Sequence, residues 1–232
     1  MNAIRVWDLP TRLFHWTLAL LVLVLVITGN VGGNAMIWHF RCGYAVLSLL
    51  LFRLLWGFVG GHWSRWRQLS CTSSALRQYF SEQSSQQRYL GHNPIGSLSV
   101  IALMSLLLLQ VATGLFSDDE IANAGPLTVW VSESIVSMTT QWHKGFGKGL
   151  VLLLIAIHVG AILWYFVKKK ENLSRAMLWG DKSYESPATA SLDRPRDWLK
   201  ALLCLALVAA LVFVLINATP SSLYGRAFQR YT

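Results

Sequence analysis

The stretch Gln141–Gly160, QWHKGFGKGLVLLLIAIHVG, carries two histidines in one long apolar run. His143 and His158 are 15 residues apart, so on an α-helix they differ by about 60° in azimuth and by about 22 Å along the axis. They therefore share a broad helix face and lie toward opposite sides of a membrane. An imidazole inside a transmembrane bundle is costly and indicates function, and imidazole is the usual axial ligand of haem iron.

Two more histidines open other apolar stretches of the chain. His15 lies in LFHW, at the start of the first stretch, and His39 lies in IWHFRCGY, at the start of the second. Because successive helices run in opposite directions, depth in the membrane pairs His15 with His158 and His39 with His143. Four such histidines predict two ligand pairs, although depth alone does not decide which helices touch. Taken singly, His15 and His39 also fit plain histidines at the membrane surface.

The composition predicts the fold class. Of the 232 residues, 54% are hydrophobic and 13% are charged, which is too apolar for an ordinary soluble domain. A transmembrane helix needs about 20 predominantly apolar residues. We therefore predict an all-α integral membrane helical bundle, with residues 125–142 of the loop between the third and fourth helices lying along the far interface. Five stretches meet the length requirement: Leu13–Val31, Met36–Gly60, Gly96–Phe116, His143–Val167 and Trp198–Ala218.

The net charge of +9 is distributed by loop. Lys and Arg gather before the first helix, between the second and third helices, and between the fourth and fifth. The connections at residues 32–35 and 117–142 contain none, and the second of these is acidic. This positive-inside pattern predicts a cytoplasmic N-terminus and a C-terminus on the far side, weakly opposed by Arg226 and Arg230. The basic excess thus indicates topology and anionic lipid, not nucleic-acid binding.

Three cations lie at the depths of the expected ligand pairs. Arg53 follows His39 by 14 residues, about 40° from the same face and about 21 Å deeper. A buried Arg without a partner is costly, and a haem propionate at the inner level would suit its planar fork. Arg41 and Lys144 would serve an outer haem in the same way, or would extend to the membrane surface as solvated cations.

Glycines accompany the histidines on the second and fourth helices. A flat porphyrin packed against a helix needs positions without side chains, but close packing between helices uses glycine as well. Both interpretations stay open for the five glycines concerned: Gly43, Gly57, Gly145, Gly147 and Gly149.

The histidine contexts resemble those of the prokaryotic cytochrome b561 family and its relatives, the b-type cytochrome subunits of membrane hydrogenases and formate dehydrogenases. The resemblance covers about residues 6–180 and implies a four-helix core that holds two b haems, with His15, His39, His143 and His158 as the iron ligands. It also implies electron transfer between a quinone and a partner protein at the bacterial inner membrane. The motifs that carry it are RVWDLPTRLFHW, WHFRCGYAVLSLLLFRLLWGFVG, GHNPIG, QVATGLF, WHKGFG, IAIHVGAILWY and KKKENLSRAMLWG.

The resemblance divides the chain near residue 180. Residues 1–180 are expected to form the di-haem cytochrome b domain, and residues 181–232 a linker, a fifth transmembrane helix and a short periplasmic tail. The role of the fifth helix does not follow from the resemblance. One departure concerns the fourth helix, where the histidine spacing is one residue longer than in some relatives and would rotate one ligand.

A quinone site is expected at the cytoplasmic end, where electrons would enter or leave the inner haem. A quinone headgroup needs hydrogen-bonding groups beside an apolar slot, and Arg12, Trp56, His92 and Asn93 reach that level. His92 would pass a proton as the quinone turns over. In the alternative interpretation GHNP is only a helix start, with Asn93 as the N-cap and Pro94 as the first helical residue.

Three functions compete. The first is an electron-transfer subunit between the quinone pool and a periplasmic c-type cytochrome or other redox subunit. Its candidate docking residues are the acidic ones of the far-side loop: Asp118, Asp119, Glu120 and Glu133. The second is a stand-alone superoxide:quinone oxidoreductase, favoured by a cationic funnel of Arg41, Lys144 and Lys148 but opposed by the acidic loop. The third is a haem-free metal or proton transporter, although broken helices are not evident. Without a CxxCH motif, c-type haem attachment on this chain is excluded.

Overall fold

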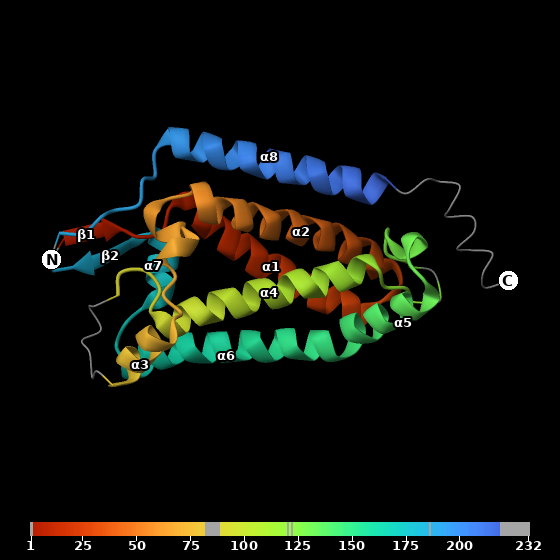
Figure 1. The fold of residues 1–232 in the computed structure, drawn as a ribbon, viewed down its shortest axis with the longest axis horizontal. Coiled ribbons are helices and arrows are strands. Elements are labelled where there is room, and N and C mark those ends of the chain that lie inside the picture. The colour runs from red at the N-terminus through yellow and green to blue at the C-terminus, as the bar shows by residue number, and fades with distance from the viewer. Residues whose placement is uncertain (1, 82–88, 120, 122, 186, 219–232) are drawn as a thin grey trace.

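The structure contains five long apolar helical segments among its described residues. They form the body of the protein (Figure 1). The structure, a computed structural model, describes residues 2–81, 89–119, 121, 123–185 and 187–218, so the tail with Arg226 and Arg230 lies outside it. All five segments are long and apolar enough to cross a membrane, which confirms the all-α membrane bundle. They are α1 (Leu9–Val31), α2 (Met36–Val59), α4 (Pro94–Leu115), α5 (Glu133–Gln141) with α6 (Gly147–Lys168), and α8 (Pro195–Asn217).

Helix α2 lies at the centre of the bundle. It packs against α1, α4 and α8, and α4 packs in turn against α6. The side chains of Val46, Leu50 and Trp56 on α2 are at most 1% exposed. Large apolar side chains on the outward faces of α1, α6 and α8 are exposed instead, as a surface that meets lipid tails requires.

Side-chain caps and one glycine set the helix boundaries. Asp8 accepts a hydrogen bond from Thr11 N at 2.9 Å and begins α1, and Asn93 accepts one from Gly96 N at 2.7 Å and begins α4. Both are good N-cap residues, and the start of α4 is the predicted one. At the other end of α1, Gly32 has a φ of 68°, a left-handed conformation that glycine adopts without strain.

The fourth spanning segment begins at Glu133 rather than at His143, so the prediction of an interfacial loop up to residue 142 was wrong. Helix α5 continues through a π-helical turn, Trp142–Phe146 (η6), into α6. The polar residues of SESIVSMTTQ lower the mean hydropathy of this segment, so the sequence did not indicate a spanning helix there. Glu133 does favour a helix, because an acidic side chain in the first turn interacts favourably with the helix dipole. The 36 residues from α5 to α6 span about 54 Å, so one end projects beyond a hydrocarbon core of about 30 Å.

A small sheet at one end of the bundle was not predicted. Strand β1 (Asn2–Arg5) pairs antiparallel with β2 (Asp181–Tyr184), which follows the short helix α7 (Leu173–Trp179). The short helix α3 (Ser73–Ser81) lies at the same end (Figure 1). Strands of four residues are too short to show a hydrophobic period. The apolar cluster at this end consists of Ile4, Val6, Trp7, Leu90 and Ala176.

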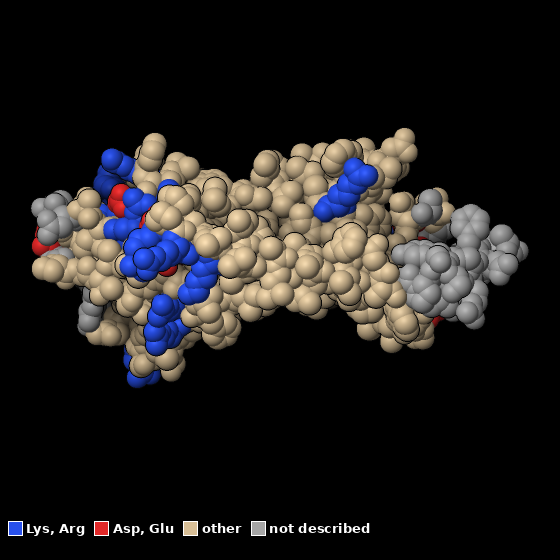
Figure 2. All heavy atoms as spheres, turned by 90° about the horizontal axis from the view of Figure 1, so that it is seen from above, with Lys and Arg blue, Asp and Glu red and all other residues tan. Residues whose placement is uncertain are grey.

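Positive charge gathers at the end that carries the sheet. Figure 2 shows most of the Lys and Arg of one face there, with a stretch of uncharged surface beside them. This asymmetry agrees with the loop pattern of the sequence. It supports the prediction that the sheet end is cytoplasmic.

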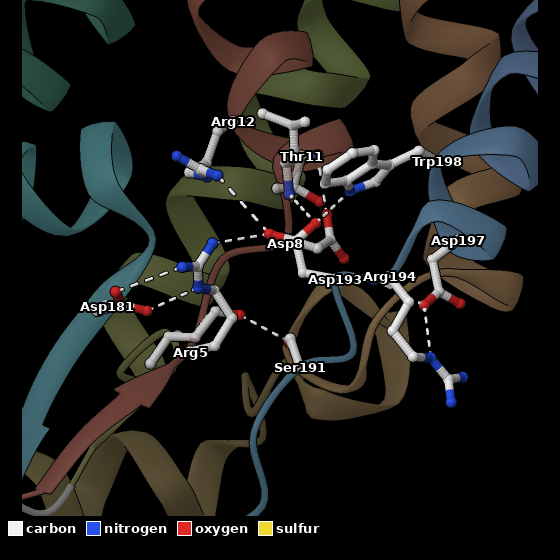
Figure 3. Close-up of polar contacts among 12 residues, drawn as sticks. Arg5, Asp8, Thr11, Arg12, Asp181, Ser191, Asp193, Arg194, Asp197 and Trp198 are labelled. Carbon is white, nitrogen blue, oxygen red and sulfur yellow. Dashed lines mark hydrogen bonds and ion pairs between the residues drawn. The ribbon is translucent and has the colours of Figure 1, made fainter.

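Asp193 fastens the N-terminal segment to the start of α8 (Figure 3). Its carboxylate accepts hydrogen bonds from Leu9 N at 3.1 Å and from Trp198 Nε1 at 2.6 Å, and it pairs with Arg5 at 2.7 Å. The backbone N–H of Ser191 donates to Arg5 O at 2.7 Å. The segment that precedes α8 is therefore hydrogen-bonded to the first residues of the chain.

We predict that Asp8→Ala costs about 3 kcal/mol of unfolding free energy. Asp8 is fully buried. Besides capping α1, its carboxylate accepts hydrogen bonds from Ser64 Oγ at 2.8 Å, Gly61 N at 3.0 Å and Trp56 Nε1 at 3.2 Å. Alanine would remove this acceptor from the indole N–H of Trp56 and the backbone N–H of Gly61, and Ser64 would keep only its bond to the Thr11 hydroxyl. Unfolding by dodecyl sulfate in mixed micelles measures the loss.

The matched control is Asp181→Ala, which removes a carboxylate that pairs with Arg5 at the surface. Exposed ion pairs contribute about 1 kcal/mol or less, so this variant should stay close to the wild type. Equal losses in the two variants would contradict the assignment of Asp8 as a buried anchor.

Candidate functional site

The histidine pairs expected from depth face one another across the bundle. His15 on α1 and His158 on α6 have ring centroids 6.4 Å apart. His39 on α2 and His143 in η6 have ring centroids 6.1 Å apart. Two imidazoles on opposite sides of one metal ion, each with a nitrogen roughly 2 Å from it, have ring centroids about 6 Å apart. Both pairs therefore have the separation that one shared iron requires.

Backbone carbonyls orient the outer pair, His39 and His143. Nδ1 of His39 lies 3.0 Å from Leu25 O, and Nδ1 of His143 lies 2.8 Å from Gln110 O. When Nδ1–H donates to a carbonyl, the Nε2 lone pair is left for a metal. In both histidines of the outer pair, the proton is thus on Nδ1 and is donated to a carbonyl, while Nε2 is free to bind a metal. Metal-binding histidines usually have this arrangement.

The inner pair, His15 and His158, is held differently. The ring of Trp16 packs against His15 at 5.1 Å between centroids. Among the described residues, the buried Nδ1 of His15 has no hydrogen-bond partner. Because buried polar atoms are normally hydrogen-bonded, this orphaned atom fits a place where a further group binds.

Two glycines that the sequence analysis missed make room for the outer pair. A Cβ atom on Gly29 would lie 3.0 Å from Cε1 of His39, and one on Gly114 would lie 2.8 Å from Cε1 of His143. Carbon atoms rarely approach so closely. The available signal was the repeated Thr-Gly near the outer ends of α1 and α4, at residues 28–29 and 113–114.

The five glycines considered from the sequence divide into two groups. A Cβ on Gly57 would collide with the indole of Trp66, and a Cβ on Gly147 would collide with Gln110 and Trp142. These two glycines therefore serve contacts within the protein. Around the remaining three, no atom of the described residues lies within 4 Å of a Cβ, which leaves space for a flat ligand: Gly43, Gly145 and Gly149.

Arg53 is buried toward the end of α2 that lies near the sheet. It is 5% exposed, and its guanidinium lies 4.5 Å from the ring centroid of Trp66. Within the described part of the chain, its buried Nη1 has no hydrogen-bond partner. A buried cation with an unused donor fits a carboxylate partner such as a haem propionate.

The other expected cations have protein contacts. Arg41 lies over the ring of Trp38 at 5.2 Å, and Lys144 Nζ lies 3.5 Å from Asp118 O. Arg12 donates to the carbonyl of Leu178 at 2.6 Å. Arg41 and Lys144 keep exposed side chains at the outer end of the bundle.

His92 packs under the sheet end of the protein. Its ring lies 4.7 Å from the Trp7 ring between centroids. Burial, together with smaller contributions from the nearby charges of Arg53 and Lys182, lowers the pKa of His92 to about 3. The side chain is therefore neutral at pH 7, so it can offer both a donor and an acceptor to a ligand.

Asn93, beside it, joins a group of hydroxyls that the sequence analysis did not find. Its side-chain nitrogen donates to the hydroxyl of Tyr165, which lies 2.6 Å from the hydroxyl of Tyr79. Tyr79 is on α3 and Tyr165 is near the end of α6, so their contact could not be read from sequence spacing. Trp56, in contrast, is 1% exposed and donates its N–H to Asp8, so its indole is not available at the surface.

A membrane-spanning bundle with two facing imidazole pairs has the features of a membrane cytochrome in which histidines hold the haem. The family model of prokaryotic cytochrome b561 matches residues 6–180, and the chain belongs to this family. Membership implies haem b as the cofactor. The expected family is thereby confirmed.

Relatives of known description support the same class. The chain is 25% identical over 233 residues to a probable Ni/Fe-hydrogenase B-type cytochrome subunit of Azotobacter vinelandii, covering 84% of this chain and 92% of the relative. It is 24% identical over 224 residues to a probable Ni/Fe-hydrogenase 1 B-type cytochrome subunit of Escherichia coli K12, covering 82% and 94%. No solved structure matches the chain.

We predict that Gly114→Ala lowers the haem b content of the purified protein, because the added Cβ would displace the His143 ring. Gly160→Ala is the control, since Gly160 is exposed on α6 and no atom of the described residues lies within 4 Å of a Cβ at that position. The ratio of haem to protein, from the absorbance of the pyridine complex, measures the effect. A Gly114→Ala protein with the haem content of Gly160→Ala would show that this close contact is unimportant.

Proposed function

We propose that the protein passes electrons between the quinone pool and a periplasmic redox partner, through two haem b groups bound one above the other in the bundle. The observation that carries this proposal is the pair of facing imidazoles at each end, with ring centroids 6.4 and 6.1 Å apart. A single pair would serve one haem only. Two pairs near opposite sides of the membrane provide a route across it.

Each haem has ligands from two helices. His15 and His158 hold the inner haem, and His39 and His143 hold the outer one. When bound, haem b supplies one-electron transfer at a potential that its ligands and their hydrogen bonds tune. Arg53 pairs with a propionate of the inner haem, because its buried donor has no other described partner. Arg41 and Lys144 lie at the outer end and serve the propionates there.

The redox partner binds at the outer end. The names of the relatives support a hydrogenase-type subunit as this partner, and a periplasmic c-type cytochrome or other redox subunit would fit the same place in the route. Asp119 contributes less to docking than the sequence indicates. Its carboxylate accepts hydrogen bonds from Ile121 N at 3.0 Å and Asn123 N at 2.8 Å, and so holds its own loop.

The quinone binds at the inner end, beside the start of α4. His92 and Asn93 lie there, and both offer hydrogen-bonding groups to a quinone headgroup. Because His92 is neutral at pH 7, it does not hold an extra proton at rest. It accepts a proton from one group and passes it to another as the quinone turns over. Arg12 lies at the same end, whereas Trp56 supports Asp8 and is left out of the site.

The location follows from the charge distribution. The sheet end, rich in Lys and Arg, faces the cytoplasm, and the outer histidine pair faces the periplasm, in the bacterial inner membrane. Residues 1–180 form the di-haem domain. Residues 181–232 provide the linker, the fifth transmembrane helix and a periplasmic tail, and Asp193 attaches this part to the first residues of the chain.

His158→Ala should reduce the haem content from two to one per chain, because only the inner pair loses a ligand. The remaining haem should keep the low-spin spectrum of two histidine ligands. His62→Ala is the control, since His62 lies in a short turn after α2 and packs on Trp63. Optical and electron paramagnetic resonance spectra measure the outcome. Loss of both haems, or of neither, would contradict separate sites.

His92→Ala should keep both haem spectra and lose most of the quinol-linked reduction of the haems. The alanine removes a hydrogen-bonding group beside the quinone but no iron ligand. Stopped-flow reduction by a soluble quinol analogue measures the rate, with His62→Ala again as the control. A wild-type rate would show that His92 is structural and that the quinone binds elsewhere.

A further inference from the structure

We propose that the side-chain amide of Gln110 positions His143 by holding the π-helical turn η6 in place, and thereby tunes the outer haem. This inference rests on the proposed function, in which His143 is an iron ligand. Gln110 does not touch the iron in this account. It acts through the histidine, as a positioning residue.

The turn that carries His143 is not α-helical. The backbone N–H of Gly147 donates to Trp142 O, five residues back, whereas in an α-helix it would donate to His143 O. Such a turn adds one residue to the helical repeat. Side chains before it are therefore rotated by about 100° relative to those of an unbroken α-helix. The rotation accommodates the long spacing between His143 and His158 and directs His143 toward His39.

The wide turn deprives His143 O of its usual helical donor, and Gln110 supplies one. Nε2 of Gln110 donates to His143 O at 2.8 Å, and Nδ1 of His143 lies 2.8 Å from the backbone oxygen of the same Gln110. One residue on α4 thus fixes both the backbone and the ring of His143. Gln110 is also the only Gln or Asn within α4, where a polar side chain in apolar surroundings is costly unless it is bonded.

The space around the amide is tight. A Cβ on Gly147 would collide with Oε1 of Gln110 and Nε1 of Trp142. Among the described residues, these two buried atoms have no hydrogen-bond partner. Gly147 is itself buried. The absence of a side chain at Gly147 therefore leaves room for the Gln110 side chain beside the turn. In the part of the chain that the structure describes, that side chain makes one hydrogen bond, to His143 O.

The position of His143 has an electronic consequence. An imidazole whose Nδ1–H donates to a carbonyl is a more basic ligand through Nε2, and such hydrogen bonds are one of the ways in which a protein sets a haem potential. Loss of the Gln110 amide would leave His143 O without this donor and relax the turn. The Nδ1 bond would lengthen, and the potential of the outer haem would rise.

The test compares Gln110→Met with Gln141→Met in the full-length, haem-loaded protein. Methionine keeps the length of the side chain and a high helix propensity but has no amide. Gln141 is an exposed glutamine two residues before His143, and its amide donates to Ser137 Oγ on the same helix at 3.3 Å. The measurements are a redox titration of each haem and its low-spin electron paramagnetic resonance signal.

Gln110→Met should shift the signal of the outer haem and raise its midpoint potential, while the inner haem stays unchanged and Gln141→Met matches the wild type. Selective loss of the outer haem would support the same conclusion. Unchanged signals in Gln110→Met, or equal changes in both haems, would overturn it. A wild-type protein without two bis-histidine signals would instead refute the proposed function itself.

Discussion

Two imidazoles can share one iron only when their rings face each other across about 6 Å, and this distance constrains the whole bundle. Helices α1 and α2 each provide one histidine, whereas α6 and the turn before it provide both partners. Helix α4 packs against α2 and α6 and so sets the gap between the two sides. Gly114 and Gln110 are both on α4, and both contact His143 of the outer pair. Helix α4, which carries none of the four histidines, is therefore the spacer that sets the distance between them.

The two ends of the bundle meet this constraint by different means. At the outer end, hydrogen bonds from Nδ1 to backbone carbonyls and a π-helical turn orient His39 and His143. The inner end depends on the small sheet, on the buried carboxylate of Asp8 and on the Asp193 contacts that join the start of α1 to α8. The fifth helix thus adds to the packing of α2 and to the anchoring of the inner end.

The sequence contains much of this architecture, for identifiable physical reasons. The length of the apolar stretches indicates the membrane-spanning helices. Because successive helices run in opposite directions, the histidines pair by depth, and the distances between the ring centroids agree with this pairing. The start of the segment at Glu133, the sheet and the contact of Tyr79 with Tyr165 were not predictable in this way. The first has polar composition, the second has strands too short for a period, and the third joins residues 86 apart in sequence. The π-helical turn is invisible to any analysis that assumes a constant helical repeat.

The most direct measurement is the number and coordination of haems in the purified wild-type protein. The haem-to-protein ratio and the low-temperature electron paramagnetic resonance spectrum can be recorded on one sample. Two haem b per chain, both low-spin with two histidine ligands, are expected from the facing pairs. A ratio of one haem per chain in well-folded protein, or a high-spin five-coordinate haem, would contradict the account.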